Sequence, residues 1–157
     1  MNSPPSESAG IIAPPLILYL GALMMGFIMH TISPQPIFAS PAIGKLLGLL
    51  LLLLSGCFAR WAFVAMRQAG TTADPRKPST ALAMNGPFRL SRNPIYLAMT
   101  GLYLGITFLG NTWWFAILLA PLLLIMHFGV ILREEHYLAK QFGATYLEYK
   151  STVRRWL

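Results

Sequence analysis

Long apolar stretches separated by shorter polar ones dominate the chain. Crossing the hydrocarbon core of a membrane takes about 20 apolar residues at about 1.5 Å rise per residue. Four stretches are long enough, or nearly so: residues 11–32, 42–66, 94–110 and 112–132. Pro14 and Pro15 place the start of the first helix just after them, and Gly110-Asn111 leaves room only for a tight turn. The pattern predicts an all-α, polytopic membrane protein with four spans, the last two forming a helical hairpin.

The composition agrees with this interpretation. Of 157 residues, 55% are hydrophobic and 11% are charged, whereas soluble domains carry about 25% charged residues. A signal peptide is the alternative for the first stretch, but residues 1–10 contain no Lys or Arg, so we expect a retained helix. The single cysteine, Cys57, lies inside an apolar stretch and excludes a disulfide framework within one chain.

The positive charges are unevenly distributed. Eleven of the twelve Lys and Arg residues lie from Arg60 onward, in residues 60–92 and in the tail that begins at Arg133. The positive-inside rule places both clusters in the cytoplasm, together with both termini, and places the uncharged loop at residues 31–41 outside. We therefore expect a multi-pass protein of a bacterial inner membrane. Its net charge of +7 then indicates contact with anionic membrane lipids and not with nucleic acid.

A polar connector, residues 67–92, joins the second and third stretches. Loops of this length are usually functional or disordered. Its Pro, Gly, Asn and Thr residues fix turn geometry, so we expect an ordered cap on the cytoplasmic side. The next helix should start at Pro94 with Asn93 as its cap, and this structural role alone accounts for the Asn-Pro pair.

The same helix start could also bind an anion. Free N–H groups and the positive end of the helix dipole lie there. Arg89 and Arg92 add full positive charges, and Tyr96 stands one turn inside the helix. These residues predict a cytoplasmic site for a carboxylate or another anion.

Two glutamates, Glu134 and Glu135, follow the fourth stretch. Negative charge is unfavourable at a helix C-terminus, so Arg133 or the tail arginines should compensate them. An ordinary ion-paired surface is the simpler interpretation of the glutamates. A carboxylate beside an anion site would instead suit a zwitterionic ligand. A metal site formed by His127 and Glu134 lacks a recognised ligand spacing, so we expect no metal.

The tail after the fourth stretch is amphipathic. Aromatic and apolar residues recur at three- and four-residue spacing, at Tyr146, Tyr149, Val153 and Trp156, and Gly143 should separate two helical pieces. An interfacial helix, with its aromatic residues at headgroup level, is the simpler interpretation. That interpretation leaves the neighbouring glutamates unexplained.

Together these segments resemble the isoprenylcysteine carboxyl methyltransferase family and the related phospholipid N-methyltransferases, over about residues 70–157. The family pattern is Gly-Pro-Tyr/Phe-Arg, Arg-His-Pro-x-Tyr, a helical hairpin, Glu-Glu, and Phe-Gly-x-x-Tyr-x-x-Tyr. Here the elements stand at Gly86, Pro87, Phe88 and Arg89; Arg92, Asn93, Pro94 and Tyr96; Glu134 and Glu135; and Phe142, Gly143, Tyr146 and Tyr149. Asn93 replaces the family's His, and an amide cannot take a proton near neutral pH. A general base at this position would be lost, whereas a ligand-binding role survives.

The resemblance implies a membrane enzyme that uses S-adenosylmethionine on its cytoplasmic side, while a lipophilic or small acceptor enters from the bilayer. A single membrane domain, residues 1–157, would then place two spans in residues 1–66 and the cofactor-binding catalytic region in residues 67–157. The cofactor's zwitterionic end could use the helix start and arginines for its carboxylate and a glutamate for its ammonium.

The expected cofactor-binding residues are Arg89, Arg92, Asn93, Pro94, Tyr96, Leu97, Glu134, Glu135 and Arg154. Among them Asn93, Tyr96 and Glu135 are the candidates for catalysis. Two other functions fit the same pattern: a non-enzymatic lipid-binding protein, and an NADPH-dependent membrane reductase similar to sterol reductases. The pattern leaves the chemical class of the acceptor open.

Overall fold

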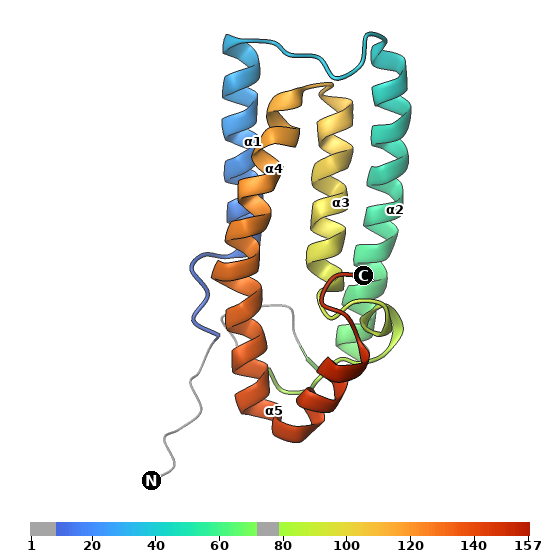
Figure 1. Cartoon of the computed structure of the whole chain (residues 1–157). Coiled ribbons are helices and arrows are strands. Elements are labelled where there is room, and N and C mark those ends of the chain that lie inside the picture. Colours follow the sequence, from blue (N-terminus) through green and yellow to red (C-terminus); the bar gives the residue numbers. More distant parts are fainter. Residues whose placement is uncertain (1–8, 72–78) are drawn as a thin grey trace.

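The computed structural model describes residues 9–71 and 79–157, and these residues form helices and no strand. Four long helical segments run side by side (Figure 1). They are α1 (Pro15–Ile32), α2 (Pro41–Gln68), α3 (Pro94–Leu109), and a continuous segment made of α4 (Trp113–Ile125), the π-helix η2 (Met126–Ile131) and α5 (Leu132–Thr152). A 3₁₀ helix, η1 (Gly86–Arg89), lies in the connector. The predicted all-α fold with a terminal hairpin is confirmed.

The helices differ in their capacity to span a membrane. Among the described residues, α1, α2 and the segment Trp113–Thr152 are long and apolar enough to cross. The 16 residues of α3 rise only about 24 Å, less than the thickness of a typical hydrocarbon core. The first 20 residues of the segment Trp113–Thr152 suffice for its crossing, so most of α5 extends beyond the membrane.

The two ends of the bundle carry different segments (Figure 1). The α1–α2 loop and the α3–α4 turn share one end, where the Asn111 Oδ1 atom accepts hydrogen bonds from the Ile37 and Phe38 N–H groups at 3.1 and 2.8 Å. Asn111 has φ +46, so the tight turn at Gly110-Asn111 is confirmed. The connector and α5 lie at the opposite end, as the distribution of charge predicts.

Glycines hold α3 against α2. A Cβ atom at Gly48 would lie 2.7 Å from the Gly105 carbonyl oxygen, and one at Gly44 would lie 2.6 Å from the Phe108 carbonyl oxygen. Gly44 and Gly48, like Gly101 and Gly105, are four residues apart, which is the small-residue spacing that lets membrane helices approach closely. This contact fixes where the start of α3 lies.

A second contact joins α1, α3 and α4. Its buried core contains Tyr19, Tyr103, Phe115, Leu122, Met126 and Val130. The Tyr103 hydroxyl donates to the Phe115 carbonyl at 3.0 Å, which satisfies a polar group inside an apolar bundle. Large apolar side chains such as Leu46, Leu53 and Phe27 stay exposed on the outer surface. A lipid environment favours such a surface.

The fourth helix does not end after the membrane span. It continues through η2 into α5, so Glu134 and Glu135 lie inside a continuous helix. The expectation that they oppose the dipole of a helix C-terminus is therefore wrong. The π-helical turn contains an extra residue and rotates the faces of α5 relative to those of α4. The Gly129 carbonyl in η2 accepts a hydrogen bond from the Ile12 N–H at 3.1 Å.

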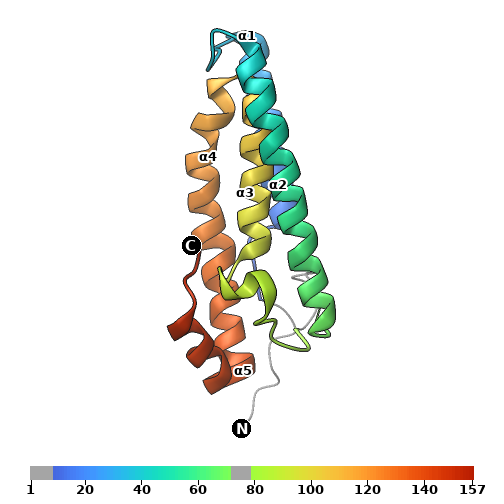
Figure 2. The same cartoon turned by 90° about the vertical axis from the view of Figure 1, so that its right-hand side faces the viewer.

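Gly143 divides α5 into two pieces, as predicted. Its φ of +52 and ψ of −127 are non-helical, and the chain folds back after it (Figure 2). The helix ends at Thr152 and Val153 is extended, so the predicted helical stripe does not reach Val153 or Trp156. Tyr146 and Tyr149 are 1% and 7% exposed and point into the protein. The interfacial interpretation, which placed them at headgroup level, is wrong for these two tyrosines.

Candidate functional site

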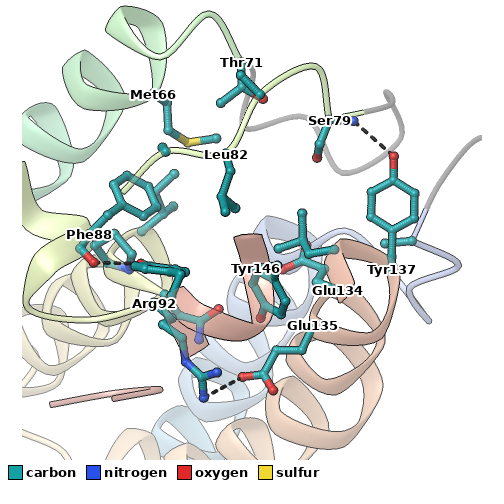
Figure 3. A pocket seen from close by; sticks show the side chains of 18 of the residues that line it. Met66, Thr71, Ser79, Leu82, Phe88, Arg92, Glu134, Glu135, Tyr137 and Tyr146 are labelled. Atoms are coloured by element: carbon teal, nitrogen blue, oxygen red, sulfur yellow. Dashed lines mark hydrogen bonds and ion pairs between the residues drawn. The ribbon is translucent and has the colours of Figure 1, made fainter. Parts of the chain in front are cut away.

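A cavity of about 150 Å³ lies where the connector, the start of α3, and α5 meet (Figure 3). Met66, Leu82, Ala83, Phe88 and Ile95 contribute apolar walls. The ionisable side chains that line it are Arg92, Tyr96, Glu134, Glu135, Tyr137, Tyr146 and Tyr149. The cavity therefore combines apolar walls from α2, the connector and α3 with ionisable side chains from Arg92, α3 and α5.

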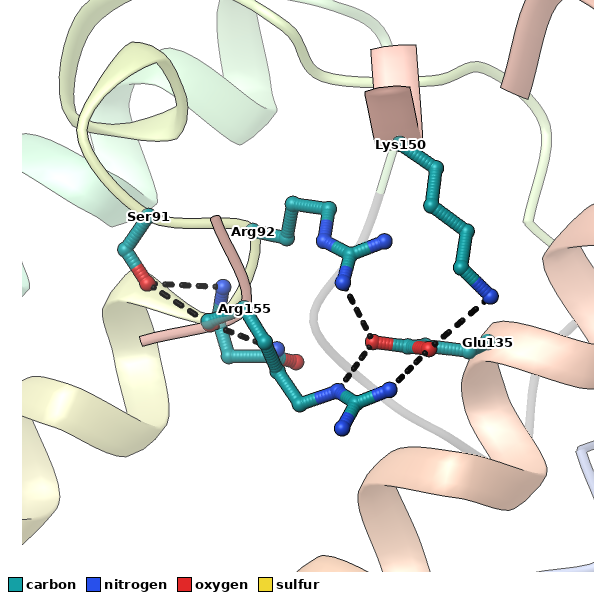
Figure 4. Close-up of polar contacts among 6 residues, drawn as sticks. Ser91, Arg92, Glu135, Lys150 and Arg155 are labelled. Carbon is teal, nitrogen blue, oxygen red and sulfur yellow. Dashed lines mark hydrogen bonds and ion pairs between the residues drawn. The ribbon is translucent and has the colours of Figure 1, made fainter. Parts of the chain in front are cut away.

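Glu135 is the centre of an ionic network (Figure 4). The Arg155 guanidinium donates from Nε to Oε1 at 2.7 Å and from Nη2 to Oε2 at 2.9 Å. Arg92 Nη2 lies 3.2 Å from Oε1, and Lys150 Nζ lies 3.4 Å from Oε2. Burial raises the pKa of Glu135, but the hydrogen bond from Arg155 and the three positive charges outweigh burial and hold that pKa below its ordinary value. One carboxylate among three cations leaves an excess of positive charge at this wall.

Backbone hydrogen bonds tie the C-terminal segment, residues 153–157, to the start of α3. The Arg92 N–H donates to the Arg154 carbonyl at 2.9 Å. The Arg155 carbonyl accepts from the Ser91 hydroxyl at 3.1 Å and from the Asn93 Nδ2 at 3.0 Å. Asn93 stands at the N-cap position, yet its side chain caps no helical N–H. The predicted helix start at Pro94 with Asn93 in the N-cap position is confirmed, but the Asn93 side chain donates to the C-terminal segment instead of capping the helix.

Arg92 carries two donors that no described residue satisfies. Its side chain is 8% exposed, and its Nε and Nη1 atoms are buried with no hydrogen-bond partner among the described residues. Unsatisfied buried donors of a charged group are costly. A carboxylate or another anion in the cavity would satisfy them. The residues present therefore fit the carboxylate of an amino acid.

Glu134 has a different environment from its neighbour. The Tyr96 hydroxyl donates to its Oε1 at 2.6 Å, and both residues line the cavity. Burial raises the pKa of Glu134 to about 7, and the hydrogen bond from Tyr96 only partly offsets that rise. Two adjacent carboxyls thus differ in protonation near neutral pH.

Aromatic residues close the cavity. Phe88 is 8% exposed, and its carbonyl accepts a hydrogen bond from the Tyr149 hydroxyl at 2.7 Å. On the far wall the Tyr137 hydroxyl accepts from the Ser79 N–H at 3.1 Å (Figure 3). These contacts join α5 to both ends of residues 79–92, the longer described part of the connector. That part forms the expected ordered cap, whereas residues 72–78 lie outside the described residues.

Most predicted site residues meet at the cavity. Arg92, Asn93, Pro94, Tyr96, Glu134 and Glu135 all line it. Arg89 is exposed and borders a separate shallow hollow with Glu148, and Leu97 does not line the cavity. Arg154 is exposed and contributes only its carbonyl to the network.

The expectation that a tail arginine compensates the glutamates is confirmed by the pair of Arg155 and Glu135. Arg155 was not among the predicted site residues, however, and Ser91 and Lys150 were not predicted. Arg154 and Arg155 are neighbours, and the choice between them depends on where α5 ends and how the chain continues. No pattern in the sequence predicts the conformation of the chain after α5. Among the described residues, no group of three or more His, Cys, Asp or Glu side chains is placed to hold a metal ion.

Comparison with known proteins gives one match. Residues 43–145 match the family model described as phospholipid methyltransferase. No curated protein and no solved structure matches the chain. The matched range contains all but the first two residues of α2, together with the connector, α3 and both glutamates, and it ends before Lys150 and Arg155.

Proposed function

The chain belongs to the phospholipid methyltransferase family, and on this premise we propose that it transfers a methyl group from S-adenosylmethionine to a lipophilic or small acceptor that arrives from the membrane. The observation that carries this proposal is the buried Arg92, which lines a cavity at the end of an apolar bundle and has two nitrogens with no hydrogen-bond partner among residues 9–71 and 79–157. The region from residue 67 onward would bind the cofactor, on the cytoplasmic side of the membrane.

The charge of the network supports the binding of an amino-acid carboxylate. Arg92, Lys150 and Arg155 surround the single carboxylate of Glu135, so an added anion improves the charge balance. The first turn of α3 lines the same cavity, and its dipole also favours negative charge. Arg92 would hold the carboxylate, with Asn93, Pro94 and Tyr96 beside it. Glu135 would act by holding Arg92 in place.

S-adenosylmethionine, when bound, supplies a methyl group already activated by a positively charged sulfur. The protein's own contribution is then orientation and exclusion of water. Phe88, Tyr146 and Tyr149 are buried at the cavity and keep water from its inner wall. The outer surface of the bundle is apolar, which suits an acceptor delivered by lipid.

Titration of the purified protein in detergent tests the proposal. S-adenosylmethionine and its demethylated product should bind, whereas NADPH should not. The absence of binding up to about 1 mM, the upper range of typical substrate constants, would remove the methyltransferase function. Tight binding of NADPH would favour a reductase, and binding of neither would favour a lipid-binding protein.

A second assay tests transfer directly. Protein in lipid vesicles is incubated with S-adenosylmethionine that carries an isotopic label in its methyl group. We expect the label in the lipid-extractable fraction, dependent on Arg92. Cofactor binding without any transfer of label would indicate that the acceptor is not a component of the vesicle.

A further inference from the structure

The adjacent glutamates of α5 differ in what surrounds them. Glu135 contacts three cations between 2.7 and 3.4 Å and is fixed by a forked hydrogen bond from Arg155. Among the described residues, the Glu134 carboxylate has a hydrogen bond only from the Tyr96 hydroxyl. Successive helical residues project about 100° apart, so the two carboxyls serve different parts of one cavity.

We propose that Glu134, hydrogen-bonded to Tyr96 at the cavity wall, is the catalytic residue that takes a proton from the methyl acceptor. This inference rests on the proposed function and goes beyond it, because it separates Glu134 from cofactor binding and implies an acceptor that loses a proton. The Asn93 amide, which also lines the cavity, cannot accept that proton.

The position of Glu134 suits this role. Both partners line the cavity, and the Tyr96 hydroxyl lies 2.6 Å from Glu134 Oε1, so a polar group next to either could exchange a proton with the pair. Tyr96 comes from the first turn of α3, and its carbonyl accepts from the Thr100 hydroxyl, which is within 2.8 Å of the Tyr19 hydroxyl of α1. The main chain at Tyr96 is thus linked through Thr100 to α1.

Other ionisable groups around the pair do not take its place. Arg92 and Glu135 are joined in the ionic network, and the Tyr149 and Tyr137 hydroxyls are hydrogen-bonded to the connector. Tyr146 is buried, and burial raises its pKa to about 12, so it stays protonated near neutral pH. Enzymes that use acid–base catalysis often contain two neighbouring carboxyl groups whose environments shift their pKa values in opposite directions, as they do for Glu134 and Glu135.

The step balances for an acceptor with a primary ammonium. The ammonium gives one proton to the Glu134 carboxylate, and its nitrogen gains a lone pair. This lone pair forms a bond to the methyl carbon of the sulfonium donor, the carbon–sulfur bond breaks, and its electrons remain on sulfur. The products are a methylated ammonium, a neutral thioether and a protonated Glu134.

Infrared spectroscopy of the full chain in detergent, without cofactor, tests the proton acceptor directly. We expect a protonated-carboxyl band that titrates with a midpoint near pH 7 in the wild type and in Glu148→Gln, a matched change at an exposed glutamate of α5. The band should be absent in Glu134→Gln. A wild type without the band, or a band that persists in Glu134→Gln, would overturn the proposal.

A kinetic experiment distinguishes catalysis from cofactor binding. With vesicles that contain phosphatidylethanolamine as probe, Glu134→Gln should lower the transfer rate about 100-fold while leaving the affinity for S-adenosylmethionine within about threefold. Tyr96→Phe should move the pH inflection of the rate upward, because the Tyr96 hydrogen bond lowers the pKa of Glu134. A large loss of cofactor affinity in Glu134→Gln would overturn the proposal in favour of a cofactor-binding role. A wild type that binds no S-adenosylmethionine would instead overturn the proposed function, whatever the infrared result.

Discussion

Glu135 and Arg155 are joined by two parallel hydrogen bonds, at 2.7 and 2.9 Å, although 20 residues separate them in the chain. This fork holds the C-terminal segment against the start of α3. The same carboxylate reaches Arg92 at 3.2 Å, so the fold of the C-terminal segment and the position of Arg92 depend on each other.

Removal of the central carboxylate should destabilise the protein. In Glu135→Ala the Arg92 guanidinium, 8% exposed, loses its only ionic partner among the described residues, and a broken buried ion pair costs about 3 kcal/mol. We expect the midpoint of thermal unfolding in detergent to fall by roughly 6–12 °C, with weaker binding of S-adenosylmethionine. Glu148→Ala is the control on the same helix, and an equal loss in both variants would refute the role of the network.

Arg89 and Arg92, at the end of the connector, should differ in their effect on cofactor binding. Arg92→Met removes the buried donors and should lower the affinity for S-adenosylmethionine about 10- to 100-fold. Arg89→Met changes an exposed side chain outside the cavity and should leave the affinity unchanged. Calorimetric titration of both variants measures this difference, and the reverse order would show that the anion site lies at Arg89.

Asn93 should act as a donor to the C-terminal segment. In Asn93→Ala the Arg155 carbonyl keeps its hydrogen bond from Ser91, so the loss of stability should be about 1 kcal/mol. Asn93→Asp places an acceptor against that carbonyl and should be the more destabilising change. Thermal unfolding of the two variants checks the order, and equal stability would mean that the contact contributes nothing.

The raised pKa of Glu134 predicts how stability depends on pH. A carboxyl that is easier to protonate in the folded state stabilises the fold most below its unfolded pKa, near 4.5, and this contribution is lost as the pH rises through about 7. The wild type should therefore lose thermal stability relative to Glu134→Gln between about pH 5 and pH 8. Parallel unfolding curves for the two proteins across that range would contradict the shift.

The kink at Gly143 should be required for the site. Its φ of +52 with ψ −127 is a conformation that essentially only glycine adopts, so Gly143→Ala should cost about 1–3 kcal/mol and weaken the contact between Glu135 and Arg155. Gly56→Ala is the matched control, because a Cβ there meets nothing within 4 Å and alanine favours a helix. Thermal unfolding and cofactor titration of both variants measure the difference. A neutral Gly143→Ala would show that the chain folds back without the kink.

Much of the fold could be predicted because membrane helices are encoded locally. Apolar length, the prolines at residues 14, 15 and 94, and the turn at Gly110-Asn111 each act within a few residues. The four-residue spacing of Gly44, Gly48, Gly101 and Gly105 is also a local signal for close packing of α2 against α3, although none of the predictions used it. The end of the fourth helix was not predictable. The π-helix η2 continues it into α5 by a change in backbone hydrogen bonding, and this change leaves no clear pattern in the sequence.

The sequence by itself determined that this chain is a helical membrane protein and which two polar segments carry the candidate chemistry, because hydrophobic length and motif order are properties of neighbouring residues. Only the tertiary structure decided that Arg155 and not Arg154 pairs with Glu135, that Asn93 binds the C-terminal segment, and that Glu134 and Glu135 have opposite environments. These outcomes depend on the rotation of α5 after the π-helical turn and on the reversal at Gly143. Gly143 marks in the sequence where the chain reverses, but the residues that the reversal brings together lie far apart in the chain, and no local pattern records those partners.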